Sequence, residues 1–180
     1  MSAFAWHRYA FAVLALALFA APLHAQEKRP IQLSLVAPLQ IFPEEDTIAG
    51  FRLNVIYGSN VAVSGFDLGV ANHTTTGTFK GVQFGILGLA DTEFIGWQNN
   101  WVNITMERFE GFQSGVVNYS HGASGFLLAG VNVTNQMHGL QLAIVNYTER
   151  MHGIQVGLIN IIKEGGAFPF FPIVNWSFEE

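Results

Sequence analysis

Apolar and polar residues alternate along most of this chain, and the alternation restarts at a recurring glycine. The segment GLQLAIVNY places Leu140, Leu142 and Ile144 on one face of an extended strand and the residues between them on the other. Each such segment ends in a short stretch of Gly, Asn, His or charged residues, as in Thr148 to His152. Helical spacing appears nowhere after residue 25, so the pattern predicts an all-β protein.

The alternating segments are copies of one repeat. Each copy reads Gly, apolar, Gln, any residue, small, apolar, apolar, Asn, any residue, Thr or Ser, and then a variable turn. The copies begin 14 to 16 residues apart, and a ninth, partial copy is predicted from Phe168. The repeat glycines are Gly50, Gly65, Gly81, Gly96, Gly111, Gly125, Gly139 and Gly153.

Two architectures accommodate a repeat of this length. In a β-solenoid each copy forms one coil that lies on the previous coil at about 4.8 Å, so that equivalent residues form ladders. In a small antiparallel up-and-down β-barrel each copy is one strand with a hairpin turn, and closure typically brings an alternation of short and long turns. The copy lengths do not alternate. We therefore expect a β-solenoid of about eight to nine coils of 14–16 residues, with the antiparallel barrel as the alternative.

Asparagine recurs at one position of the repeat. In a stack of parallel coils these side chains lie above one another, so we expect each amide to bond the next and to cap buried carbonyls of the turns. In an antiparallel meander they would alternate between two ends and form no single ladder. The predicted structural ladder comprises Asn72, Asn103, Asn118, Asn132, Asn146, Asn160 and Asn175.

The first 25 residues predict a signal peptide. Arg8 precedes an unbroken apolar run from Tyr9 to Ala21, which is too short to span a bilayer, and Ala25 supplies a small residue at the expected cleavage site. The remaining chain divides into an opening strand and cap (residues 26–49), the tandem repeats (50–166) and a C-terminal cap (167–180). The localisation expected from this reading is export, to a bacterial cell surface, outer membrane or periplasm.

The amino-acid composition restricts the classes of partner and of chemistry that the chain can have. The formal charge is −5 for the whole chain and becomes −6 once Arg8 is removed with the signal peptide. A mildly acidic chain with no basic cluster argues against nucleic acid and against anionic lipid headgroups. The absence of cysteine excludes disulfides and a thiol nucleophile. Because half of the residues are hydrophobic and only 12% are charged, the chain buries much of itself or faces lipid.

The copies GLQLAIVNY and GIQVGLINI, together with the closing PFFPIVNWSF, resemble a family of bacterial surface-repeat proteins built on the motif G-L-Q-x-G-L-x-N. The opening LQIFPEED and GFRLNVIYGSN are also similar to that family, and the resemblance extends from about Ile31 to Phe178. It implies an exported surface or outer-membrane location and transfers no catalytic residue. Arg52 and Asp67, which replace the repeat Gln, and Gly88, which replaces the repeat Asn, depart from the motif.

Candidate chemistry is sparse, and the sequence predicts no catalytic residue, no metal site and no cofactor. His138 and His152 occupy one repeat position; two stacked imidazoles can bind a metal ion, but the sequence favours solvated turn histidines. Trp97, Trp101 and Phe94, with Phe109 nearby, form an aromatic stretch that reads as packed core rather than as a binding platform or a lipid girdle.

The function expected from these features is that of an exported, non-enzymatic surface or envelope repeat protein, acting as a structural or binding module. Its partner is an unknown surface partner or a second copy, with the outer membrane as a further candidate. A small outer-membrane β-barrel is the alternative. A minor alternative is an ice- or carbohydrate-binding face, which requires an exposed grid of repeat Asn and Thr side chains, such as Asn132 and Thr134.

Overall fold

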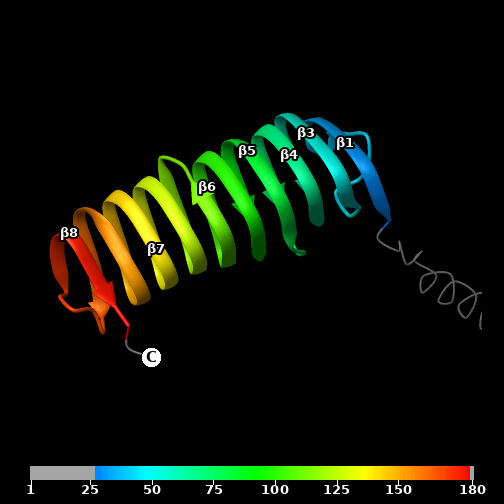
Figure 1. Cartoon of the computed structure of the whole chain (residues 1–180). Coiled ribbons are helices and arrows are strands. Elements are labelled where there is room, and N and C mark those ends of the chain that lie inside the picture. The colour runs from blue at the N-terminus through cyan, green and yellow to red at the C-terminus, as the bar shows by residue number, and fades with distance from the viewer. Residues whose placement is uncertain (1–26, 179–180) are drawn as a thin grey trace, which may run out of the picture.

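The computed structural model describes residues 27–178, so the predicted signal peptide lies outside the described residues. All regular structure in these residues is β-strand, arranged as one rod from β1 at one end to β8 at the other (Figure 1). The strands are β1 (Lys28–Val36), β2 (Leu39–Gln40), β3 (Thr47–Asn60), β4 (Ala62–Thr74), β5 (Phe79–Ala90), β6 (Glu93–Ser114), β7 (Val117–Glu164) and β8 (Phe170–Ser177).

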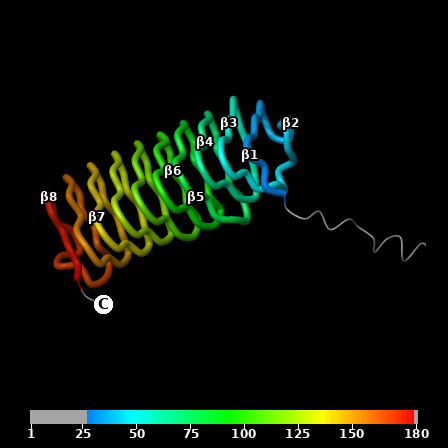
Figure 2. Tube along the Cα trace, turned by 45° about the vertical axis from the view of Figure 1, so that its right-hand side comes forward, coloured from blue at the N-terminus to red at the C-terminus, as the bar shows by residue number. Residues whose placement is uncertain are grey.

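Neighbouring coils run in the same direction. β1 pairs in parallel with β3, and the parallel pairing continues from β3 through β4, β5 and β6 to β7. β7 is 48 residues long and winds through several coils by itself (Figure 2). The predicted β-solenoid is therefore confirmed. The alternative of an antiparallel barrel is wrong for this part of the chain, because consecutive copies stack instead of reversing direction.

The repeat glycines set the register of the stack. Gly50 pairs with Gly65, Gly65 with Gly81 and Gly81 with Gly96. All eight repeat glycines have φ between 127° and 151°, a backbone conformation that side chains disfavour. A Cβ at any repeat glycine would approach a backbone oxygen of the preceding coil to 1.9–2.2 Å. Eight stacked glycines enclose about seven turns, slightly fewer than the eight to nine coils expected from the sequence.

Apart from the buried Ala90, Leu127 and Ile162, the hydrophobic core of the rod is one inward column. It lies two residues before each repeat glycine and widens in the middle of the stack, where Phe79, Phe94 and Phe109 are fully buried. Phe79 and Phe94 stack with ring centroids 4.3 Å apart, and Phe94 stacks on Phe109 at 5.7 Å. The column members are Ile48, Val63, Phe79, Phe94, Phe109, Ala123, Met137 and Met151.

Both ends of the rod carry antiparallel strands. At the N-terminal end β2 folds back on β1. At the C-terminal end β8 runs antiparallel to the last coil of β7, with Asn175 opposite Gln155. The segment from Phe168 is thus not a ninth parallel copy. Its antiparallel strand covers the edge of the stack, which protects the open backbone groups of the last coil from further pairing.

A charged cluster fastens the N-terminal end. The Arg29 side chain donates from Nε to Asp46 Oδ2 at 2.9 Å and lies 2.5 Å from a carboxylate oxygen of Glu27. The hydrogen bond to Asp46 raises the pKa of Arg29, and the guanidinium also lies 4.6 Å from the Phe42 ring centroid. These contacts hold the segment after β2 against β1.

Candidate functional site

The interior of the solenoid is polar, and its main feature is a ladder of asparagines. Asn103 donates from Nδ2 to Asn118 Oδ1 at 2.8 Å, and Asn118 donates in the same way to Asn132 at 3.0 Å. The ladder continues from Asn132 to Asn146 at 3.0 Å and from Asn146 to Asn160 at 2.9 Å. All of these side chains are fully buried. A continuous row of amide–amide hydrogen bonds forms only when parallel coils are stacked in register. The row therefore favours one register of the coils as well as their parallel direction.

The ladder asparagines also bond backbone carbonyls of the next coil. Asn103 donates to Ser114 O at 2.8 Å, and Asn146 donates to Val156 O at 2.9 Å. One amide therefore bonds both its neighbour in the ladder and a backbone carbonyl of the next coil.

Two predicted members stand apart from the continuous ladder. Asn72 accepts from Asn54 at 2.8 Å and donates to Phe84 O at 3.0 Å, because Gly88 replaces asparagine in the next coil. Asn175 lies on the antiparallel strand β8 and donates to Phe168 O at 2.8 Å. The continuous ladder thus extends only from Asn103 to Asn160.

The glycine at position 88 is compensated from the following coil. Asn100 fills the space beside Gly88, where an added Cβ would lie 2.2 Å from Asn100 Nδ2. Asn100 donates to Gln83 Oε1 at 3.0 Å and to Asn103 Oδ1 at 2.7 Å. The amide missing at one repeat position is therefore supplied from another, a substitution that the repeat pattern alone did not indicate.

The two other departures from the repeat form a buried ion pair. Arg52 and Asp67 are both 0% exposed and lie in register in adjacent coils. Arg52 donates from Nε to Asp67 Oδ1 at 2.8 Å and from Nη2 to Oδ2 at 2.7 Å. Asp67 also accepts from Asn54 at 3.1 Å and from Gln83 at 2.9 Å. The pair joins the column of buried glutamines, since Gln98 donates in turn to Gln83 at 3.1 Å.

The repeat Thr and Ser side chains are buried with the asparagines. Thr105, Ser120, Thr134 and Thr148 are each fully buried, and the Thr134 and Thr148 hydroxyls bond each other. These residues therefore cannot form the exposed grid that an ice- or carbohydrate-binding face requires. That minor alternative is wrong on its own criterion.

The paired histidines lie on the outer surface as a short stack. The rings of His138 and His152 have centroids 6.1 Å apart, and Phe178 packs against His152 at 5.9 Å. Within residues 27–178 no three His, Cys, Asp or Glu side chains gather in a way that could hold a metal ion.

The aromatic stretch divides between the inside and the outside. Phe94 and Phe109 belong to the buried column, as expected for core residues. Trp97 and Trp101 instead point outward and are 40% and 64% exposed. Their assignment to the core is wrong, because the alternation places them on the opposite side of the strand from the inward Gln98 and Asn100.

The outside of the rod carries the second feature of the site, which we call the apolar side. It consists of the outward residues at the first, third, fifth and sixth positions after each repeat glycine. No charged residue occupies any of these positions in any coil. Its exposed members are Phe51, Val55, Ile56, Phe66, Leu68, Val70, Ile86, Trp97, Trp101, Val116, Leu128, Leu140, Leu142, Ile144, Ile154, Leu158 and Ile159.

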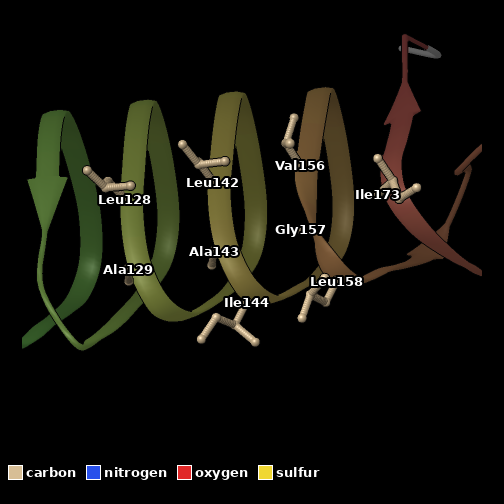
Figure 3. Close-up of a pocket in the computed structure, with 9 residues that line it drawn as sticks. All are labelled: Leu128, Ala129, Leu142, Ala143, Ile144, Val156, Gly157, Leu158 and Ile173. Atoms are coloured by element: carbon tan, nitrogen blue, oxygen red, sulfur yellow. The ribbon is translucent and has the colours of Figure 1, made fainter.

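The apolar side turns a corner of the coil. Leu128, Leu142 and Val156 form one row across successive strands, and Ile173 of β8 extends that row (Figure 3). Ile144 and Leu158 project from the bend below the row (Figure 3). Together these residues line a shallow apolar groove of about 440 Å³.

Charges gather along a different line of the coil, which we call the polar rim. The rim comprises the outward residues from the tenth position after each repeat glycine to the residue before the next one. Apart from the buried Arg52 and Asp67, it holds every charged residue between positions 50 and 166. Those residues are Lys80, Asp91, Glu93, Glu107, Arg108, Glu110, Glu149, Arg150, Lys163 and Glu164.

Comparison of the chain with models of known families, with curated proteins and with solved structures gives no match. The resemblance to a family of surface-repeat proteins thus stays a prediction. Residues 27–178 contain no helix of the length and hydrophobicity needed to traverse a bilayer.

Proposed function

We propose that this chain is an exported, non-enzymatic envelope protein whose apolar side is a docking surface. The observation that carries the proposal is the separation of the apolar side from the polar rim along the whole stack. A random scatter of exposed hydrophobic residues needs no explanation, but a continuous strip without charge does.

The size of the strip supports docking. Eight rungs at about 4.8 Å extend for about 34 Å, and the six residues after each glycine cover about 20 Å of backbone. The apolar side therefore measures about 700 Å², above the roughly 300–600 Å² of the largest apolar patch on a typical monomer. A surface of this size in water favours association with another apolar surface.

The buried network supports a structural role for the interior. Its amides and hydroxyls bond one another and the backbone, and few of them are left for a ligand. The outside of the rod would therefore bind the partner, while the buried hydrogen bonds keep the coils aligned.

Cell fractionation tests the two parts of the proposal. We expect the chain expressed with residues 1–25 to lose them and to be recovered with the envelope. The double variant Ile144→Lys/Leu158→Lys should be processed equally but be released in soluble form. Met106→Lys is the matched control, because Met106 is 54% exposed on the polar rim.

The outcomes separate export from docking. Recovery of the unprocessed chain in the cytoplasm would contradict export. Equal release of the wild type, the double variant and the Met106→Lys control would contradict docking through the apolar side.

A further inference from the structure

We propose that the partner of the apolar side is a lipid bilayer, on which the rod lies flat with its outward apolar side chains at the boundary between headgroups and acyl chains. This inference rests on the proposed function, because it names the partner of the same surface. One feature of the structure favours lipid over a folded partner, and three more make the surface compatible with a neutral bilayer.

The first feature is the corner in the apolar side. Leu142 on the strand is 37% exposed, whereas Ile144 and Leu158 at the bend are 59% and 68% exposed and project in another direction (Figure 3). A second copy of the chain, packed on the flat strands, would leave the bend in water. A fluid bilayer adapts to a surface that turns a corner and covers both parts.

The second feature is that the polar side chains on this surface bond each other. Asn99 and Ser114 are the polar side chains at its third position, and Ser114 Oγ donates to Asn99 Oδ1 at 2.9 Å. The Trp97 indole donates to Ser114 Oγ at 3.5 Å. Polar groups that are already bonded cost less to remove from water, so these bonds lower the cost of insertion.

The third feature is the state of the backbone beneath the apolar side. Parallel pairing bonds each coil to its neighbours along the strands, and the register shifts at the bend. Backbone bonds between coils continue there, as from Val116 N to Trp101 O at 2.7 Å and from Val131 N to Val116 O at 3.0 Å. The antiparallel strands β2 and β8 cover the two ends. In lipid an unpaired backbone group costs several kcal/mol, so a sheet enters only when its backbone groups are bonded internally.

The fourth feature is charge. The polar rim keeps its ion pairs, such as Arg108 with Glu110 at 3.0 Å, away from the apolar side. No basic cluster accompanies the apolar side, and the formal charge of the chain is −5. The bilayer surface that fits is therefore electrically neutral, and insertion depends on apolar contact rather than on attraction to anionic headgroups.

Flotation with lipid vesicles tests the inference on the purified exported protein. We expect it to float with vesicles of phosphatidylcholine alone, with no gain from added phosphatidylglycerol and no loss in high salt. The double variant Ile144→Lys/Leu158→Lys should partition at least about tenfold more weakly, because a Lys inserted among acyl chains is costly. Met106→Lys should float like the wild type, and circular dichroism melting of each variant checks that the fold is retained.

Tryptophan fluorescence adds a depth readout. In a Trp176→Phe background the remaining tryptophans of the described chain are Trp97 and Trp101, both on the apolar side. Bromine-labelled phosphatidylcholine should quench their emission in the parent protein. In the double variant the quenching should be lost with the binding.

The outcomes distinguish this inference from the proposed function. If the lysine variants lose envelope association in cells but the wild type does not float with any vesicle, lipid is excluded while docking stands. Formation of a dimer that the same variants dissociate, without flotation, would identify a second copy as the partner and overturn the inference. Flotation that requires phosphatidylglycerol and disappears in high salt would also overturn it, because binding would then be electrostatic.

Discussion

The interior and the exterior of this solenoid differ in a way that reverses the usual arrangement. Apart from one apolar column and single apolar residues such as Leu127 and Ile162, the inside is lined by buried amides and hydroxyls, such as those of Asn132 and Gln141. The apolar side outside is lined by aliphatic and aromatic side chains. In most globular proteins the fully buried residues are mainly apolar and long polar side chains stay in water.

The difference assigns two tasks to two sets of residues. Hydrogen bonds are directional and fail when coils slip, so the polar interior selects one register. Apolar contact is not directional and depends on area, so the exterior suits docking rather than fold specification. Substitutions inside should therefore change stability, and substitutions outside should change association.

The largest loss of stability is expected from a substitution in the column of repeat glycines. In Gly125→Ala the new Cβ would lie 2.1 Å from Gly111 O, at a φ of 129°. Neither the neighbouring backbone nor the backbone of residue 125 relieves this clash, so we expect loss of cooperative folding. Thermal melting followed by circular dichroism measures it.

Gly122→Ala is the matched control for that prediction. Its Cβ would meet only Glu107 O at 3.5 Å, which is an ordinary contact. A Gly125→Ala variant that melts like Gly122→Ala would show that the coils are not stacked at this distance.

The second-largest loss of stability is expected when the buried ion pair is broken. Replacing Arg52 alone by Gln leaves Asp67 buried without its bidentate partner, and such a loss costs about 3–5 kcal/mol of unfolding free energy. The double variant Arg52→Gln/Asp67→Gln restores the repeat glutamine in both coils and should be more stable than either single variant. A double-mutant cycle in urea measures the coupling, and additive single effects would contradict the pairing.

A smaller loss is expected when the asparagine ladder is interrupted. Asn132→Ala removes the bonds to Asn118 and Asn146 and leaves buried polar groups without partners, at a cost of about 2 kcal/mol. Gln136→Ala, on the exposed polar rim, should change the unfolding free energy little. Equal midpoints for the two variants in urea would argue against a structural role for the ladder.

The smallest effect on stability is expected on the apolar side. Val116 is 58% exposed at a bend, so Val116→Lys should change the unfolding free energy by no more than about 0.5 kcal/mol. A loss as large as that of Asn132→Ala, measured in the same urea titration, would mean that the outer residues stabilise the coil. The separation between inner residues that set stability and outer residues that set association would then be wrong.

The period and the direction of the coils could be predicted from the sequence. The repeat spacing and the fixed phase of Gly and Asn indicated a parallel stack, since only parallel coils keep like residues in contact. The strand alternation separated Gln141 from Leu142. The alternation did not indicate which of the two faces points inward, because both faces repeat with the same period and only the packing of the folded coil distinguishes them.

The compensating exceptions could not be predicted from single positions. Arg52 and Asp67 were each visible as departures, but their pairing depends on the contact between adjacent coils. Asn100 supports Gly88 from a different repeat position, which no column comparison reveals. The antiparallel strand β8 was missed because PIVNW resembles the repeat, although its neighbour across the sheet runs the other way.

The antiparallel strands at the two ends give the rod a fixed length. A whole copy inserted between them would lengthen the body by one step of about 4.8 Å and leave both terminal contacts unchanged. Gain or loss of whole copies therefore changes the length of the rod in uniform steps and leaves the structure of every other coil unchanged.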